Sequence, residues 1–102
     1  MSEIYSVAQL QNVLNPIFRK NNVRKAILFG SYSKGNATPH SDVDLMVDSG
    51  LRGLAFFGLV DDVCESLDCD VDIMDITDII PDSKVDREIK QTGVVIYEQE
   101  QV

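Results

Sequence analysis

The first part of the chain has the hydrophobic spacing of an amphipathic helix. Between residues 7 and 21, apolar positions recur three or four residues apart and would form one buried stripe: Val7, Leu10, Val13, Leu14, Ile17 and Phe18. Ser6 and Gln9 resemble a capping box, in which the serine oxygen accepts the N–H of the third helical residue. Pro16 lies inside this pattern and has no N–H, so we expect a kink or a break near Asn15.

Four shorter apolar segments predict β-strands. They lie at residues 25–29, 42–48, 70–75 and 94–97. The second segment alternates strictly, so it would place an apolar set of side chains on one face and a set with two acids on the other. The two sets are Val43, Leu45 and Val47, against Asp42, Asp44 and Met46.

Two further helices are predicted after the second strand. Residues 54–67 have an inner apolar stripe of Phe56, Leu59, Val60, Val63 and Leu67. Ser83 is suited to cap a short helix that ends near Thr92 and Gly93, since glycine readily adopts the left-handed conformation past a helix end. The order of elements predicts an α/β (α+β) fold. It would be a small mixed sheet of about four strands covered by helices on one face, in a single domain over residues 1–102.

The net negative charge of the chain argues against a protein that binds nucleic acid. The 102 residues include 17 acidic and 9 basic ones, for a net charge of −8, and such a surface repels nucleic acid. No apolar run approaches the roughly 20 residues that cross a bilayer. Residues 1–5 lack the layout of a signal peptide, so we expect a cytoplasmic protein without membrane contact.

Cys64 and Cys69 match neither a redox pair nor a zinc knuckle, and we expect reduced, partly buried thiols.

Asp42 and Asp44 are the first candidate site residues. On a strand, residues two apart face the same side at about 6.7 Å, so the two carboxylates repel each other unless water or a cation relieves them. A solvated strand face is one interpretation. The other is a site for Mg²⁺, which prefers oxygen ligands and few protein carboxylates.

Gly30 and Ser31 follow a buried strand, and ten residues separate Ser31 from Asp42. Glycine lets the backbone approach a ligand closely, and serine offers a hydroxyl and an N–H. If a helical turn begins at Ser31, its free N–H groups would bind an anion. A phosphate-binding turn followed by two acids is the arrangement that a nucleoside triphosphate and its metal ions need.

Asp72 is a third candidate acid. It lies between Val71 and Ile73 in an apolar strand, where a carboxylate is costly unless it is paired, solvated or bound to a metal. Asp70 has the same parity and would project to the same side. Asp75 has the opposite parity and is interpreted as a strand-end or turn residue.

The stretch from Gly30 to Asp44, with Gly-Ser, ten residues and Asp-Val-Asp, resembles the signature of the DNA polymerase β-like nucleotidyltransferase superfamily. Within it, the chain is most similar to the minimal (MNT-type) nucleotidyltransferases over nearly its whole length. The resemblance implies ATP as substrate, two Mg²⁺ ions, and in-line attack of a hydroxyl on the α-phosphorus with release of pyrophosphate. Gly30 and Ser31 would hold the β- and γ-phosphates. Asp42 and Asp44 would bind both ions, and Asp72 would complete the ion nearer the acceptor and help to deprotonate the attacking hydroxyl.

The loop between the two halves of the motif contains secondary candidates. Lys34 would either contact a phosphate or stay solvated. Ser41 would either orient Asp42 by a hydrogen bond or close a turn. His40 is either an exposed loop residue or a proton carrier with a suitable pKa, and Tyr32 would stack or pack.

The resemblance also implies a partner. Minimal nucleotidyltransferases often act beside a HEPN-domain protein, and several are antitoxins that transfer AMP to a tyrosine of that ribonuclease toxin. Since no substrate domain is expected after the last strand, the acceptor would be held by such a partner, by a second copy of the chain or on the open face. We favour protein adenylylation, with Phe56 and Phe57 as either partner contacts or core residues. The alternatives are transfer to a small molecule such as an aminoglycoside, and a non-catalytic module that neutralises a partner by contact.

Overall fold

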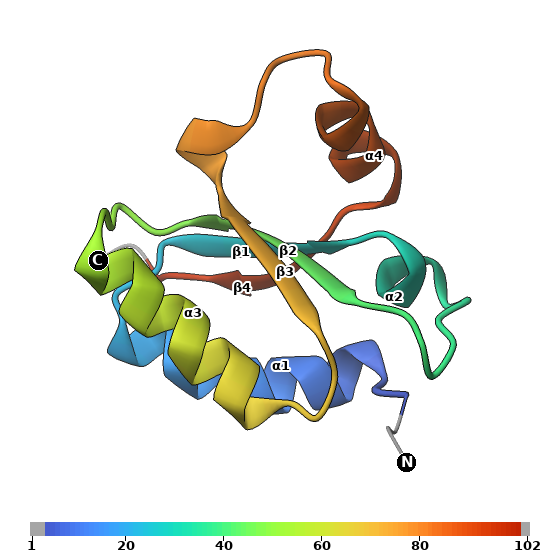
Figure 1. The fold of residues 1–102 in the computed structure, drawn as a ribbon, viewed down its shortest axis with the longest axis horizontal. Helices are drawn as coiled ribbons and strands as arrows, with labels where there is room; N and C mark the ends of the chain where they lie inside the picture. The colour runs from blue at the N-terminus through green and yellow to red at the C-terminus, as the bar shows by residue number, and fades with distance from the viewer. Residues whose placement is uncertain (1–3, 101–102) are drawn as a thin grey trace.

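The computed structural model describes residues 4–100, which form a four-stranded sheet with helices packed against it (Figure 1). In chain order the elements are α1 (Val7–Lys20), β1 (Lys25–Phe29), α2 (Ser31–Lys34), β2 (Val43–Asp48), α3 (Leu54–Ser66), β3 (Val71–Asp75), the short 3-10 helix η1 (Ile76–Asp78), α4 (Lys84–Thr92) and β4 (Val94–Glu98). Every predicted strand is present, with ends shifted by at most one residue. The α+β class is confirmed.

Helix α1 begins at the predicted capping box and continues through Pro16. The Ser6 hydroxyl oxygen accepts the Gln9 N–H at 3.1 Å, and the Gln9 side chain accepts the Ser6 N–H at 2.8 Å. We expected a kink or a break near Asn15, and the break is wrong, because one helix runs from Val7 to Lys20. Burial of an apolar side chain contributes about 1.5–3 kcal/mol, so the buried face of α1 offsets the donor missing at Pro16. That face consists of Leu10, Leu14 and Phe18.

The sheet has the strand order β3-β2-β1-β4 and is mixed. Strand β1 is antiparallel to both β2 and β4, whereas β2 and β3 are parallel. A parallel pair needs a crossover connection, and α3 supplies it. This topology places β2, which carries Asp44 and directly follows Asp42, between β1 and β3.

The main core lies between the sheet and two long helices. Helices α1 and α3 contact each other and cover one face of the sheet, below it in Figure 1. The core includes Leu14, Phe18, Leu28, Leu45, Leu59 and Val63. Helix α4 lies on the opposite side, above the sheet in Figure 1, where it contacts β1 and has no buried residue. The expectation of helices on one face therefore describes α1 and α3, and α4 adds a short element on the other face.

Gly93 ends α4 without the left-handed conformation that was expected. Its φ of −65° and ψ of 134° are open to most residues. Space is the constraint instead: a Cβ would collide with the carbonyl oxygen of Ile89 and lie 2.9 Å from Cγ2 of Ile27. The prediction is corrected accordingly, since glycine at this position lets the end of α4 pack closely on β1.

Gly93→Ala is expected to lower the free energy of unfolding by about 1–3 kcal/mol, because the added methyl group must displace backbone atoms. Gly58 within α3 is the matched control, since a Cβ there meets no atom within 4 Å. Gly58→Ala should raise the free energy of unfolding by about 0.5–1 kcal/mol. Chemical denaturation of the wild type and both variants measures these changes, and a neutral Gly93→Ala would contradict the close packing of α4.

The two cysteines are free thiols, as predicted. Cys69 is partly buried, but Cys64 is exposed on α3, so the expectation of partial burial is wrong for Cys64. Its helical position places it away from the inner stripe that Leu59 and Val63 form. Within residues 4–100, no helix combines the length and apolar character that a membrane span requires.

Candidate functional site

Asp44 and Asp72 lie side by side on neighbouring parallel strands. The register of β2 and β3 pairs Asp44 with Asp72 directly. Val43 and Leu45 are fully buried in the core under α1 and α3, so Asp44 faces the opposite side of the sheet, where α4 lies. Asp42 lies one residue before β2, and both Asp42 and Asp72 are exposed. The predicted orientation of Asp44, opposite the apolar face of the strand, is confirmed.

Negative charges crowd around Asp44. Partial burial raises the pKa of the Asp44 carboxyl, and the charges of Asp72, Glu88 and Asp42 raise it further, to about 6. Burial and like charges both disfavour the ionised form of a carboxyl group. The three acids selected from the sequence are therefore close enough for their charges to interact, and Glu88 of α4 belongs to the same acidic cluster.

Gly30 ends β1 against the carboxylate of Asp44. Its φ of 79° and ψ of −151° lie in a region that is essentially restricted to glycine. A Cβ at this position would lie 2.5 Å from Oδ2 of Asp44 and 3.6 Å from Oε1 of Glu88. The two halves of the sequence motif, which are ten residues apart in the chain, are thus in contact in the fold.

The helical turn on which the anion-binding interpretation of Ser31 depends is present as α2. The Gly30 carbonyl accepts the Lys34 N–H at 3.1 Å and the Ser33 hydroxyl at 2.8 Å. The first N–H groups of such a turn have no carbonyl acceptor within it, so they can donate to a phosphate together with the Ser31 hydroxyl. Lys34 is exposed, and its ammonium group forms no salt bridge within the described part of the chain. Its positive charge therefore lies at the end of the turn in solvent.

Helix α4 contributes two residues that the sequence analysis did not select. Thr92 Oγ1 accepts the Gly30 N–H at 3.0 Å. Glu88 lies one helical turn earlier, with its carboxylate near Gly30 and Asp44. Their spacing of four residues puts both on one face of a helix. The helix itself was predicted, but no local pattern indicates that it packs on the acidic side of the sheet.

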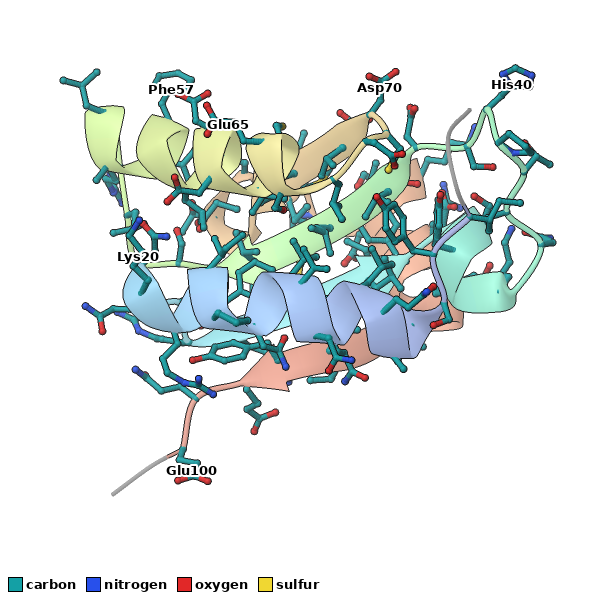
Figure 2. The ribbon with its side chains drawn as sticks, turned by 90° about the horizontal axis from the view of Figure 1, so that it is seen from below. Lys20, His40, Phe57, Glu65, Asp70 and Glu100 are labelled. Atoms are coloured by element: carbon teal, nitrogen blue, oxygen red, sulfur yellow. The ribbon has the colours of Figure 1, made fainter. Side chains whose placement is uncertain are left out.

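The secondary candidates in the loop lie outside this acidic cluster. Ser41 Oγ accepts the N–H of Thr38 at 2.9 Å, which favours the interpretation of a turn serine. Tyr32 is only 5% exposed and belongs to the core, so it packs. His40 and Asp70 point into solvent (Figure 2).

Asp75 has a structural role at the end of β3. It is buried, and Oδ1 accepts hydrogen bonds from the N–H and the hydroxyl of Ser49, at 3.1 and 2.5 Å. Oδ2 accepts from the N–H and the hydroxyl of Thr77, at 3.0 and 2.6 Å. Burial by itself would raise the pKa of Asp75, but the hydrogen bonds from Ser49 and Thr77 outweigh it and lower that pKa. Asp75 thus fastens the ends of β2 and β3 together, which confirms its interpretation as a strand-end residue.

Phe56 and Phe57 differ in exposure. Phe56 is half-buried and packs against the core. Phe57 is 64% exposed and points away from the sheet on α3 (Figure 2). Of the pair, Phe57 is thus the side chain that a partner could contact.

The donor chemistry of the acidic face suits Mg²⁺. No three His, Cys, Asp or Glu side chains among residues 4–100 converge as a ready-made metal cage. Such a cage is not required, because Mg²⁺ in nucleotide sites is held by one or two carboxylates together with substrate phosphates and water. The charge crowded around Asp44 is what a divalent cation would relieve.

A comparison with protein families shows to which family the chain belongs. The model of the polymerase beta nucleotidyltransferase family matches residues 12–102. The chain belongs to this family. The matched region includes every residue of the acidic cluster and the Gly30–Ser31 turn, so the resemblance stated from the motif is confirmed.

Individual relatives agree with the family assignment. A Methanocaldococcus jannaschii protein with the provisional name protein adenylyltransferase is 34% identical over 67 residues, or 66% of this chain and 62% of that protein. The chain thus spans less than two thirds of that relative. One chain of a toxin–antitoxin crystal structure with AMP-PNP has a TM-score of 0.71 at 27% identity, covering 88% of this chain and 74% of that one. A chain from the complex of a tri-AMPylated Shewanella oneidensis HEPN toxin with its MNT antitoxin shares the fold, with a TM-score of 0.66, 24% identity and coverage of 91% and 73%.

Removing the charge of Glu88 is expected to lower the pKa of Asp44. That pKa of about 6 is raised in part by Glu88, and in Glu88→Gln a neutral amide no longer opposes ionisation of Asp44. The titration of the Asp44 carboxyl, followed by carbon NMR in metal-free protein, should move to lower pH. Glu65→Gln on the outside of α3 (Figure 2) is the control and should leave the titration in place. An unchanged midpoint in Glu88→Gln would show that Glu88 does not face Asp44 in solution.

Proposed function

We propose that this chain is a Mg²⁺-dependent nucleotidyltransferase that transfers AMP from ATP to a hydroxyl group of a partner protein. The observation that supports this most is the contact of Gly30 with Asp44, whose carboxylate lies beside Asp72. It places a turn suited to phosphate next to acids suited to metal ions. Family membership supports the interpretation of this combination as a nucleotidyl-transfer site.

Each residue has a distinct part in the proposed reaction. Gly30 lets the backbone turn toward the β- and γ-phosphates, which the Ser31 hydroxyl and the N–H groups of α2 bind. Lys34, exposed at the end of α2, contributes positive charge to the phosphates. Two bound Mg²⁺ ions would supply positive charge at the α-phosphate and at the departing pyrophosphate.

The acids would hold the metal ions, and Asp72 would face the acceptor. Asp42 and Asp44 would bind both ions, and Asp72 would bind the ion nearer the acceptor. Because Asp72 is exposed on the edge strand β3, an acceptor hydroxyl can reach it, and its carboxylate takes the proton from that hydroxyl. The hydroxyl oxygen then bonds to the α-phosphorus as the bond to pyrophosphate breaks, which leaves AMP on the acceptor.

A protein is the acceptor that the comparisons favour. The Methanocaldococcus jannaschii relative has a name that refers to protein adenylyl transfer, and a structural relative comes from a toxin–antitoxin complex with an ATP analogue. We therefore propose a HEPN-domain toxin as the partner and one of its tyrosines as the acceptor. Phe57, exposed on α3, is a candidate contact for that partner.

Calorimetric titration of ATP, with and without Mg²⁺, tests the nucleotide site. The wild type should bind ATP only with Mg²⁺, and Asp42→Asn/Asp44→Asn should lose that binding. Asp61→Asn/Glu65→Gln removes the same charge from exposed positions of α3 and should bind as the wild type does. A wild type that binds no ATP would favour a module that neutralises its partner by contact alone.

Transfer is tested with radiolabelled ATP and a purified HEPN partner. Label in the α-phosphate should appear on the partner, whereas label in the γ-phosphate should leave with pyrophosphate. Label on the partner from γ-labelled ATP would indicate a kinase reaction, and label on neither would exclude adenylylation of that partner.

A further inference from the structure

The peptide group before Gly30 is held by a side chain from the far end of the chain. The Gly30 N–H donates to Thr92 Oγ1 at 3.0 Å. The Thr92 hydroxyl in turn donates to the carbonyl oxygen of Glu88 at 2.8 Å. Since the hydroxyl proton is used inside α4, the oxygen presents its lone pairs to Gly30, and Thr92 acts there only as an acceptor.

The other side of Gly30 is held as well. Its carbonyl accepts the Ser33 hydroxyl at 2.8 Å and the Lys34 N–H at 3.1 Å. Glycine is the residue with the greatest backbone freedom, and Gly30 has a conformation that few other residues adopt. Hydrogen bonds on both sides therefore restrict a position that would otherwise sample several orientations.

We infer that Thr92 is a positioning residue of the nucleotide site. By accepting the Gly30 N–H, it holds the Gly30 peptide in the orientation in which Ser31 can bind the triphosphate and Gly30 contacts Asp44. The inference rests on the proposed function, since it names what orients the phosphate-binding turn of that same site. Thr92 acts through Gly30 and touches neither substrate nor metal. Helix α4 thereby becomes part of the site, although none of its residues is buried in the core.

Two substitutions separate the hydroxyl from the shape of the side chain. Thr92→Val keeps the branched shape, removes the acceptor and leaves the Gly30 N–H without its partner. Thr92→Ser keeps the acceptor and should behave as the wild type does. Ser66→Ala is the matched control, because the Ser66 hydroxyl donates to the carbonyl of Val63 at 2.7 Å inside α3, away from the site.

The kinetic test compares KM for ATP with kcat for AMP transfer. Thr92→Val should raise KM roughly 10-fold, as expected for a polar group left without its partner, with a smaller effect on kcat. Thr92→Ser and Ser66→Ala should retain the KM of the wild type. If the wild type transfers AMP and Thr92→Val has the same KM for ATP, the inference is overturned, whereas the proposed function is unaffected.

Hydrogen exchange of the Gly30 amide supplies a readout that needs no nucleotide. This amide should exchange at least about 10-fold faster in Thr92→Val than in the wild type, while the amides of β1 that pair with β2 keep their rates. An unchanged Gly30 rate would overturn the inference directly. Uniformly faster exchange across β1 would also overturn it, because Thr92 would then support the whole fold. A wild type that neither binds ATP nor transfers AMP would refute the proposed function and, with it, the positioning role.

Discussion

Asp44→Asn is expected to abolish transfer while making the nucleotide-free protein more stable. Asp44 lies at the centre of the acidic cluster, so its loss should reduce the rate of AMP transfer by at least about 100-fold. The same charge is unfavourable for folding in the absence of metal, because burial and three neighbouring carboxylates oppose it. We expect the free energy of unfolding to rise by about 1 kcal/mol at a pH well above 6.

The size and pH range of this gain follow from the pKa of Asp44. A rise from 3.8 to about 6 corresponds at most to about 3 kcal/mol, and solvent screening of a carboxyl that remains partly exposed reduces this to about 1 kcal/mol. Because the pKa is higher in the folded state, the penalty of the ionised carboxylate is complete above pH 6 and absent below about 3.8. The stability gained in Asp44→Asn should therefore shrink as the pH falls through this range.

Urea denaturation at several pH values, together with the labelled-ATP assay, measures both effects. Asp48→Asn is the matched control, since Asp48 lies at the other end of β2 and pairs with Arg24 at 3.4 Å. It should leave transfer unchanged and should not stabilise the protein. If Asp44→Asn were destabilised to the same extent as Asp48→Asn, the crowding of charge around Asp44 would be refuted.

Gly30→Ala is expected to lower both the stability of the protein and its rate of AMP transfer. The backbone at Gly30 has a positive φ of 79°, which is strained for alanine, and the new Cβ would lie 2.5 Å from Asp44 Oδ2. Strain of this kind costs about 1–3 kcal/mol. Displacement of the Asp44 carboxylate should also reduce AMP transfer by at least about 100-fold.

Gly35→Ala separates backbone strain from the contact with Asp44. Gly35 also has a positive φ, 76°, but a Cβ there meets no atom within 4 Å. This variant should lose about 1 kcal/mol of stability from strain alone and keep its transfer rate. Thermal unfolding and the transfer assay on both variants make the comparison, and equal transfer by the two would mean that the contact of Gly30 with Asp44 is not needed.

Much of the site could be predicted because its parts are encoded locally. The alternation of Val43, Leu45 and Val47 determines which way Asp44 faces, since a buried face leaves the opposite side to the acids. Gly30 and Ser31 mark the end of a buried strand and the start of a turn through their own chemistry. These predictions needed no knowledge of which strands are neighbours.

Other features depended on contacts between distant segments. Pro16 does not interrupt α1, because the burial of Leu14 and Phe18 against the sheet outweighs one missing donor. Gly93 is required by the carbonyl of Ile89 and the side chain of Ile27 rather than by its own φ and ψ. The local rule failed at Pro16 because of packing against the sheet, and at Gly93 because of a carbonyl in its own helix and the side chain of the distant Ile27.

The sequence by itself determined the four strands, the three longer helices, the acidic face of β2 and the motif that places the chain in the nucleotidyltransferase family. Only the tertiary structure decided that α4 packs on that acidic face, that Thr92 accepts the Gly30 N–H and that Glu88 adds its charge beside Asp44. The physical reason is that periodicity encodes which side of an element is apolar. Which side of the sheet a short, largely polar helix occupies depends instead on loop geometry and a few specific contacts, made between residues about 60 positions apart.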